Sequence, residues 1–285
     1  MLNGPTTRTR RHRLFFKTLC LCVLVVTLPF SASAHEGLPE QIAAITAKIK
    51  RDPKNASLYL QRGELYRLHG KWIRADADYQ HALRLDPNLS IVNLARGNMM
   101  FESRRYRQAK VALDRFLRQQ PEHVEAFIIR ARVLAKMGAR LDAAQDFTKA
   151  LSLTSNPEPE LFIERAKVLA GDEHYLQKAL EGLDEGIAKF GPLVTLQLAA
   201  IDLEVRRRDY DAALKRLDLI TAQSERKETW LVRRGELLSA AGRNDEARAA
   251  FNAALVAIES LPAHRRQNRT VTTLQLRART ALRLL

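Results

Sequence analysis

The chain has 285 residues, of which 46% are hydrophobic and 28% are charged, with 12 Gly, 10 Pro and 2 Cys. Gly and Pro are too few for a collagen-like or low-complexity chain, and two cysteines cannot form a disulfide scaffold of this length. The 47 Lys and Arg exceed the 32 Asp and Glu and give a formal net charge of +15, which favours anionic partners but says nothing about fold.

Residues 1–34 have the layout of a secretory signal peptide. Residues 1–17 carry five basic residues and no acidic one, a short apolar run follows at 18–30, and Ala32-Ser33-Ala34 supplies the small residues that signal peptidase reads. We expect cleavage after Ala34 and a periplasmic or secreted location. The alternative is retention as an N-terminal anchor, for which the apolar run is short. Cleavage would remove both cysteines and lower the formal charge from +15 to +10.

Residues 35–55 are predicted to form an N-terminal capping helix. Ile42, Ile45 and Ile49 recur at helical spacing and precede Asp52-Pro53, a pair that ends a helix. Their shared face would cover the first unit of the segment that follows.

From residue 56 onward, the sequence repeats with a period of about 34 residues. Two series of small residues follow this period, with spacings that exceed it by at most two residues. The first is Gly63, Gly97, Ala131, Ala166, Ala200 and Gly235, and the second is Ala75, Ala109, Ala143, Ala179, Ala213 and Ala247. Small residues let two antiparallel helices approach closely, while large side chains fill the space on either side. The first unit contains such large residues at Tyr59, Tyr66, Trp72 and Tyr79.

This pattern resembles the tetratricopeptide repeat, a helical hairpin of about 34 residues. The resemblance implies an all-α solenoid of about six helix-turn-helix repeats over residues 56–261, with helical caps at both ends. The approximate units are 56–89, 90–123, 124–158, 159–192, 193–227 and 228–261, and residues 262–285 form a basic C-terminal capping helix. A single hairpin cannot bury its own apolar face, so the aromatic residues of the repeat are predicted to lie in the core.

Arginine recurs in one slot of the repeat, just before the first series of small residues. The positions are Arg62, Arg96, Arg130, Arg165, Arg234 and Arg277. A row of arginines could bind anions, but ion pairs within the array are the favoured interpretation. Asp78 and Asp146 follow Arg62 and Arg130 by sixteen residues, on the partner helix of the same hairpin, where each pair would satisfy both charges. The other arginines have no obvious acid at that offset.

The resemblance also implies a concave groove, lined by the first helix of each hairpin, that receives an extended peptide or a helix. The fifth positions of the repeats are Leu60, Leu94, Ile128, Ile163 and Val232, and the ninth positions are Glu64, Asn98, Arg132, Lys167 and Glu236. The family's Lys and Asn clamp for carboxylates is absent. We therefore expect a partner segment with apolar anchors. The alternative is that these aliphatic residues pack against neighbouring repeats.

The turns of the array are predicted to segregate charge. Basic residues lie in the turns inside hairpins, and acidic residues in the turns between them. The basic set is Lys71, Arg74, Arg104, Arg105, Arg107, Arg140, Arg206, Arg207, Arg208 and Arg243, and the acidic set is Asp86, Glu122, Glu125, Glu158, Glu160, Glu225 and Glu228. Complementation of helix dipoles is the favoured cause, although a basic edge could also meet an anionic envelope surface.

Sequence motifs for catalysis are absent. The six histidines from His35 onward share no metal-ligand spacing, and no phosphate loop, nucleophile elbow or paired-carboxylate motif occurs. We expect no enzyme activity, no cofactor, no metal and no nucleic-acid partner. The least favoured alternative is a metal-dependent enzyme, or a copper site at His35 as the mature N-terminus.

The expected function is that of an exported scaffold for protein–protein interaction, which binds a protein or peptide. An envelope-assembly or peptidoglycan-associated adaptor is an alternative that differs in its partner and shares the mechanism. The identity of the partner and the oligomeric state stay open at this point.

Overall fold

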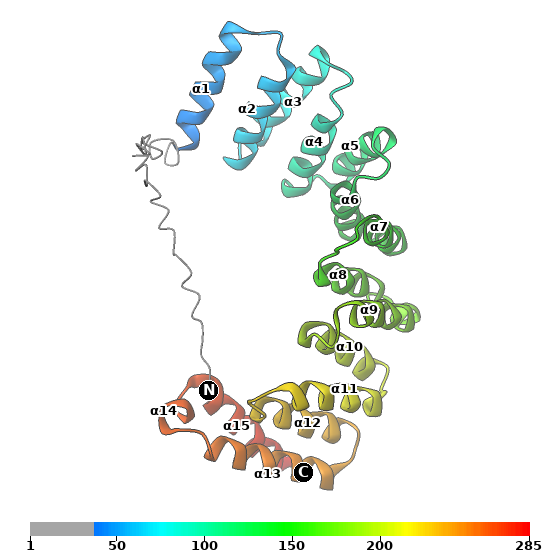
Figure 1. Cartoon of the computed structure of the whole chain (residues 1–285), viewed down its shortest axis with the longest axis vertical. Helices are drawn as coiled ribbons and strands as arrows, with labels where there is room; N and C mark the ends of the chain where they lie inside the picture. Colours follow the sequence, from blue (N-terminus) through cyan, green and yellow to red (C-terminus); the bar gives the residue numbers. More distant parts are fainter. Residues whose placement is uncertain (1–36) are drawn as a thin grey trace, which may run out of the picture.

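The computed structural model describes residues 37–285, and the regular elements of this part of the chain are helices (Figure 1). The signal peptide predicted for residues 1–34 lies outside the described residues. The helices are α1 (Leu38–Arg51), α2 (Ala56–Leu68), α3 (Trp72–Leu85), α4 (Ile91–Glu102), α5 (Tyr106–Gln119), α6 (Val124–Lys136), α7 (Arg140–Leu153), α8 (Pro159–Leu169), η1 (Glu173–Tyr175), α9 (Leu176–Phe190), α10 (Val194–Arg206), α11 (Tyr210–Gln223), α12 (Glu228–Ala240), α13 (Asn244–Glu259), α14 (Ala263–Arg266) and α15 (Arg269–Leu284).

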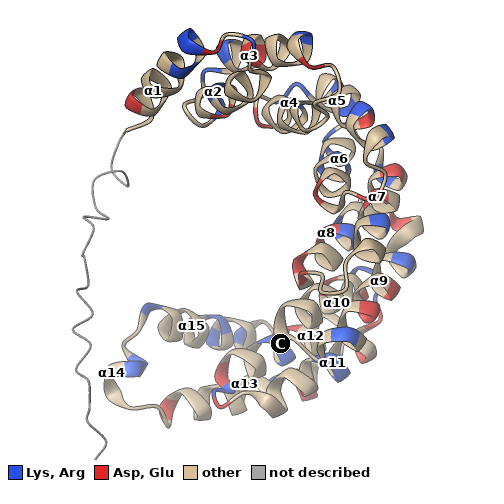
Figure 2. Cartoon of the chain, turned by 45° about the horizontal axis from the view of Figure 1, so that its top comes forward, with Lys and Arg blue, Asp and Glu red and all other residues tan. Residues whose placement is uncertain are grey.

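Successive helices pack in pairs as hairpins, from α2 and α3 to α12 and α13, and each hairpin packs on the next. The result is an open arc (Figure 1). Figure 2 shows the first helices of the hairpins along the inside of this arc and the second helices along its outside. The predicted all-α solenoid is therefore confirmed. No helix in the described part of the chain is both long enough and apolar enough to cross a membrane.

Small residues mark the crossing point of the helices in several hairpins. A Cβ atom added to Gly63 would come within 2.6 Å of the Tyr79 ring, and one added to Gly97 would come within 2.6 Å of Leu113. The missing side chain thus makes room for a large one on the second helix. The fifth hairpin departs from this pattern. At the distance before the turn where Gly63 stands in the first hairpin, it has the buried Ile201. Ala200, which the sequence placed in the series of small residues, therefore occupies the slot of the recurring arginines.

The turns within hairpins use a left-handed backbone conformation. Gly70, Gly138 and Gly242 have φ values of 69°, 82° and 74°. Arg104 and Arg208 take the same place in the α4–α5 and α10–α11 turns, with φ of 61° and 60°. A residue with a Cβ pays a steric penalty in this region that glycine does not.

The α8–α9 connection differs from the other hairpin turns because it contains the short 3-10 helix η1. It lies where the spacing of the alanine series widens by two residues, between Ala143 and Ala179. The longer connection thus accounts for part of the irregularity of the fourth unit.

The core runs through the array between the two layers of helices. Tyr79, Phe147 and Phe251 are fully buried on second helices, as the packing interpretation of the aromatic residues predicts. Other aromatic residues of the repeat, such as Tyr66 and Trp72, are half-buried and pack against the same core.

Both ends of the array are covered by helices. On α1, Ile49 is buried and Ile45 is half-buried against the first hairpin. On α15, Val271, Leu274 and Ala278 are buried against the last hairpin.

Candidate functional site

The recurring arginines form ion pairs inside the array. Nε and Nη2 of Arg62 donate to the two carboxylate oxygens of Asp78 at 2.8 and 2.7 Å. Arg130 makes the same two-point contact with Asp146, at 2.7 Å for both bonds, and its Nη1 donates to Asp114 at 2.8 Å. The predicted pairs at the sixteen-residue offset are therefore confirmed. Hydrogen bonds to these carboxylates raise the pKa of Arg62 and of Arg130.

The structure also supplies partners for the arginines that had none at that offset. Arg96 donates to Asp76 at 2.7 Å, and Arg165 donates to Glu185 at 2.5 Å. Arg234 pairs with Asp218, sixteen residues earlier, on the preceding hairpin. Each of these guanidinium groups therefore meets a carboxylate of its own chain, which leaves this row poorly suited to binding an external anion.

The five aliphatic residues expected on the groove floor are mostly covered by the array itself. Leu94, Ile163 and Val232 are buried, and the other two are half-buried against the core. Among the ninth positions, Arg132 and Lys167 are exposed and the other three are half-buried. All of them except Asn98 take part in ion pairs.

Two of those contacts join an inner helix to the next inner helix or to the C-terminal cap. Arg132 on α6 donates to Glu164 on α8 at 2.8 and 2.6 Å. Glu236 on α12 accepts from Arg277 on α15 at 3.1 and 2.5 Å. These ion pairs cross between repeats on the inner helices, so a partner in the groove would meet paired charges there.

Lys167 and Glu64 complete the set of ninth positions. Lys167 lies 3.5 Å from Glu160 of its own helix, and both side chains are exposed. Glu64 accepts a hydrogen bond from Arg67 at 3.0 Å and another from the hydroxyl of Tyr79. Burial and the bond to Glu64 raise the pKa of Tyr79, so this hydroxyl stays protonated.

One hollow of about 480 Å³ opens between the inner helices α8 and α10. Its floor is apolar, with Ile163, Leu198 and Leu203 separated by small side chains. Charged residues stand around it. The lining residues that carry charge are Glu160, Lys167, Asp202 and Arg206. Two of the predicted groove residues, Ile163 and Lys167, thus meet at one site.

Sequence reasoning gave no indication of this hollow, although a signal was present. Ala166, Ala170 and Ala199 line it, and their small side chains leave the space between the two helices open. Alanines at facing positions of adjacent first helices could have pointed to it.

Two further hollows lie away from the inner face of α8 and α10. One, of about 620 Å³, lies between α7 and α9, and its buried Arg165 is already paired with Glu185. The other, of about 900 Å³, is lined by residues around Trp230 and His264 near the C-terminal cap. The indole of Trp230 donates to the Ser224 hydroxyl at 2.8 Å, so this polar group is satisfied within the chain.

A buried polar network ties the fourth hairpin to the fifth. Glu204 on α10 accepts from Nε of Arg216 at 2.5 Å, and Arg216 also donates to Asp184 on α9 at 2.8 Å. The second carboxylate oxygen of Glu204 has no hydrogen-bond partner among the described residues. Burial raises the pKa of Glu204, and the bond from Arg216 opposes the rise.

Among the described residues, no group of three or more His, Cys, Asp or Glu side chains is placed to hold a metal ion. The copper hypothesis concerns His35, which lies outside the described residues, and it stays a prediction.

Residues 94–157 match a family model described as a tetratricopeptide repeat, and residues 173–278 match one described as a tetratricopeptide repeat-like domain. The chain is a tetratricopeptide repeat protein. Proteins built from this repeat are typically scaffolds without enzyme activity. They bind other proteins or peptides.

Among curated proteins, this tetratricopeptide repeat protein is similar to the DnaJ homolog subfamily C member 7 homolog of Schizosaccharomyces pombe, with 24% identity over 200 residues. It is also similar to tetratricopeptide repeat protein 16 of Macaca fascicularis, with 27% identity over 140 residues. The matches cover 65% and 46% of this chain but only 39% and 16% of those proteins.

Solved structures show the same fold at low sequence identity. The C-terminal part of a TPR repeat-containing protein from Cytophaga hutchinsonii has a TM-score of 0.64 at 13% identity, over 83% of this chain and 94% of that one. YrrB, described as a TPR protein with an unusual peptide-binding site, has a TM-score of 0.53 at 23% identity, over 64% of this chain and 92% of its own.

Proposed function

We propose that this tetratricopeptide repeat protein is an exported scaffold that holds a segment of another protein against the inner face of its array. The observation that carries the proposal is the hollow between α8 and α10, which combines an apolar floor with a charged surround. Its volume of about 480 Å³ suits one or two large side chains of a peptide. Export rests on the signal-peptide layout of residues 1–34.

The residues that line the hollow indicate which side chains a partner segment would carry. Leu198 and Ala199 are half-buried, so a partner side chain could contact them without unfolding the array. An apolar anchor would bury further surface on Leu198 and Ala199, at about 25 cal/mol for each Å² removed from water. The charges around the hollow would select the residues that flank the anchor. We therefore expect a short segment with one large apolar residue between polar or charged neighbours.

The test uses a library of displayed twelve-residue peptides selected on the purified chain. The selected peptides are then measured by fluorescence anisotropy on the chain, on Ala199→Trp and on Ala95→Trp. Ala95 is the matched control because it occupies the equivalent position on α4, which does not line this hollow. We expect the indole at position 199 to fill the hollow and weaken binding at least ten-fold, while the control stays within three-fold.

Two results would overturn the groove proposal: no enrichment of peptides with an apolar anchor, or equal binding by the chain and Ala199→Trp. Export is tested separately, by fractionating cells that express the full chain and sequencing the N-terminus of the product. A mature protein that begins at His35 supports cleavage after Ala34, and a full-length protein retained in the cytoplasm argues against export.

A further inference from the structure

The turns of the first three hairpins differ in charge from the turns of the last three. We call the turns at residues 68–74, 102–108 and 136–142 the basic edge. They contain seven Lys and Arg against two acidic residues. The equivalent segments 170–178, 206–212 and 240–246 contain five Lys and Arg against six acidic residues. The sequence predicts basic turns for the whole array. Among these six turns, basic residues outnumber acidic ones only in the first three hairpins.

The three turns follow one another along one edge of the array. Arg67, which precedes the first turn, donates to Glu102 at the start of the second at 2.5 Å. The second and third turns enclose a shared hollow of about 640 Å³, lined by residues 104–108 together with Lys136 and Met137. The basic edge is therefore a continuous surface.

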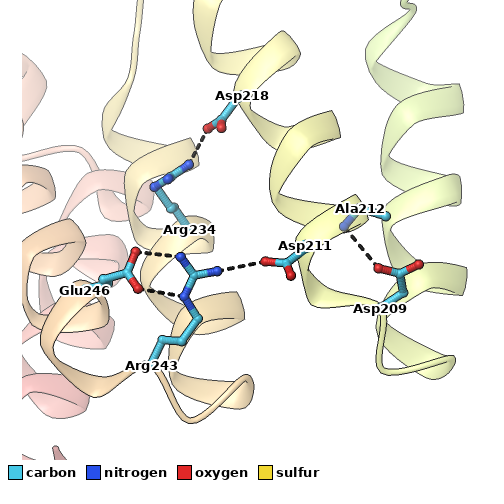
Figure 3. Close-up of polar contacts among 7 residues, drawn as sticks. All are labelled: Asp209, Asp211, Ala212, Asp218, Arg234, Arg243 and Glu246. Carbon is cyan, nitrogen blue, oxygen red and sulfur yellow. Dashed lines mark hydrogen bonds and ion pairs between the residues drawn. The ribbon is translucent and has the colours of Figure 1, made fainter.

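Several cations of the basic edge form no ion pair with a described residue. Arg207 and Arg208 in the α10–α11 turn form none either, but each of the later turns holds two acidic residues, whereas the whole basic edge holds two. In the α12–α13 turn, Arg243 donates to Asp211 at 2.9 Å and to Glu246 at 2.6 and 2.7 Å (Figure 3). On the basic edge, the exposed cations that form no ion pair with any described residue include Lys71, Arg104, Arg107 and Lys136.

Helix-dipole complementation does not account for the cations of the second turn of the basic edge. Arg105 and Arg107 stand at the N-terminal end of α5, where the helix dipole disfavours cations. The equivalent positions of α11 hold Asp209 and Asp211, and Asp209 caps that helix (Figure 3). Helix-dipole complementation, which explains basic residues at helix C-termini, therefore fails for this turn. Local rules of sequence tend to be broken where a surface has a function.

Large apolar side chains are exposed in the same turns. Ile73 is 86% exposed and Leu68 is 60% exposed, on either side of Gly70. Met137 and Leu141 are 41% and 42% exposed in the third turn. The other three turns contain none of the large apolar residues that are exposed in the described part of the chain. Exposed apolar side chains thus accompany the cations in the first and third turns of the basic edge.

We propose that the basic edge docks the protein on an anionic lipid surface. Cations would contact lipid phosphates, and the exposed apolar side chains would enter the boundary between headgroups and acyl chains. An acidic protein is less well matched, since protein interfaces bury one contiguous apolar core, whereas these apolar tips are separated by charged residues. The edge is distinct from the hollow between α8 and α10, so docking would leave that hollow accessible.

The test measures partition of the full chain onto vesicles of phosphatidylcholine alone and onto vesicles of phosphatidylcholine and phosphatidylglycerol in a two-to-one ratio. All variants share residues 1–36, so any lipid affinity of that segment is common to them. The edge variant carries Lys71→Gln, Arg107→Gln and Lys136→Gln. The control variant, Lys178→Gln, Arg207→Gln and Arg208→Gln, loses the same charge from the other turns. Each cation near an anionic surface contributes about five-fold, so the edge variant should lose roughly 100-fold in binding to the anionic vesicles.

A second pair of variants tests the apolar tips. Ile73→Ser with Leu141→Ser should weaken binding to anionic vesicles about ten-fold. Leu219→Ser with Val256→Ser, which are exposed away from the edge, should leave binding unchanged. Circular dichroism melting checks that every variant is folded.

Equal losses in the edge and control charge variants would mean that net charge alone acts, and would overturn the proposal. It would also be overturned if the edge variant bound vesicles normally but lost binding to polyglutamate, because the edge would then serve an acidic protein.

Discussion

Replacing Arg104 by glycine should stabilise the α4–α5 hairpin, because Arg104 holds a left-handed backbone conformation with φ of 61°. That conformation costs a residue with a Cβ about 1–2 kcal/mol. Glycine avoids the cost but gives the unfolded chain more freedom, which offsets about 0.4–1 kcal/mol. The net gain is therefore about 0.5–1 kcal/mol. Arg208→Gly should give a similar gain, because Arg208 has φ of 60° at the equivalent place.

The reverse change isolates the backbone contribution. An added Cβ at Gly138 would meet no heavy atom within 4 Å, so Gly138→Arg introduces strain without a clash. It should destabilise the α6–α7 hairpin by about as much as Arg104→Gly stabilises its own. Because each repeat contacts only its neighbours, the array need not unfold in one step. Amide hydrogen exchange of the helices that flank each turn is therefore the assay, supported by urea denaturation.

The result that would refute the reasoning is unchanged or faster exchange in α4 and α5 of Arg104→Gly. The same variant connects stability with the basic edge. Arg104→Gly should gain stability and lose about five-fold in binding to anionic vesicles, since it removes an exposed cation. Arg208→Gly should gain stability without that loss. If both variants bind vesicles equally well, Arg104 has no role in docking.

Three further changes test the packing and the buried charges. Asp146→Asn removes the negative charge and replaces one of the two oxygens that accept from Arg130 with an amide nitrogen, which cannot accept. It should cost about 2–3 kcal/mol in urea denaturation, and a loss no larger than that of an exposed ion pair would contradict the assigned role. Gly97→Ala should lower the melting temperature, because the added Cβ would lie 2.6 Å from Leu113. Overpacking costs about 1–3 kcal/mol, which exceeds the gain in helix propensity from replacing glycine by alanine. A higher melting temperature would contradict the close approach of the two helices. Burial raises the pKa of Glu204, so the folded chain keeps the Glu204 proton to a higher pH than the unfolded chain does. The free energy of unfolding should therefore fall as the pH rises from the ordinary glutamate pKa through the raised one. Glu204→Gln should lack this fall in urea denaturation across that range, and an identical pH profile would contradict the assignment.

The arginine pairs show how far a repeating sequence predicts contacts. The pair of Arg62 and Asp78 follows from the period, because an offset of sixteen joins the two helices of one hairpin. Arg234 uses the opposite direction and pairs with Asp218, sixteen residues earlier, on the preceding hairpin. The long guanidinium side chain reaches either neighbour, so the arginine slot fixes the location of the pair but not its partner.

Arg96 and Arg165 pair with acidic residues at a different offset in the sequence. Their partners, Asp76 and Glu185, lie twenty residues away, which is one helical turn beyond the expected offset. An acidic residue four positions along a helix faces the same side, so either position satisfies the charge. A search at offsets of sixteen and twenty in both directions would have found these pairs.

The groove was harder to predict, because the repeat pattern assigns a face to each position but not the depth of the side chain. Leu94 and Ile163 occupy the same position of the repeat and both are buried, yet Ile163 lines the hollow between α8 and α10 and Leu94 does not line it. The difference comes from neighbours outside the pattern, such as Ala170 and Ala199, whose small size leaves space beside it. Identification of a binding site in this array therefore needed the packing of two particular repeats.

The two proposed surfaces lie in different hairpins, and the solenoid keeps them energetically separate. The basic edge belongs to the first three hairpins, and the hollow between α8 and α10 belongs to the fourth and fifth. Stability in a repeat array is approximately a sum of single-repeat and nearest-neighbour contributions. Substitutions at Lys71 and at Ala199 should therefore act independently, each changing one binding activity and leaving the other intact. A double variant whose losses were not additive would show instead that the array couples its two halves.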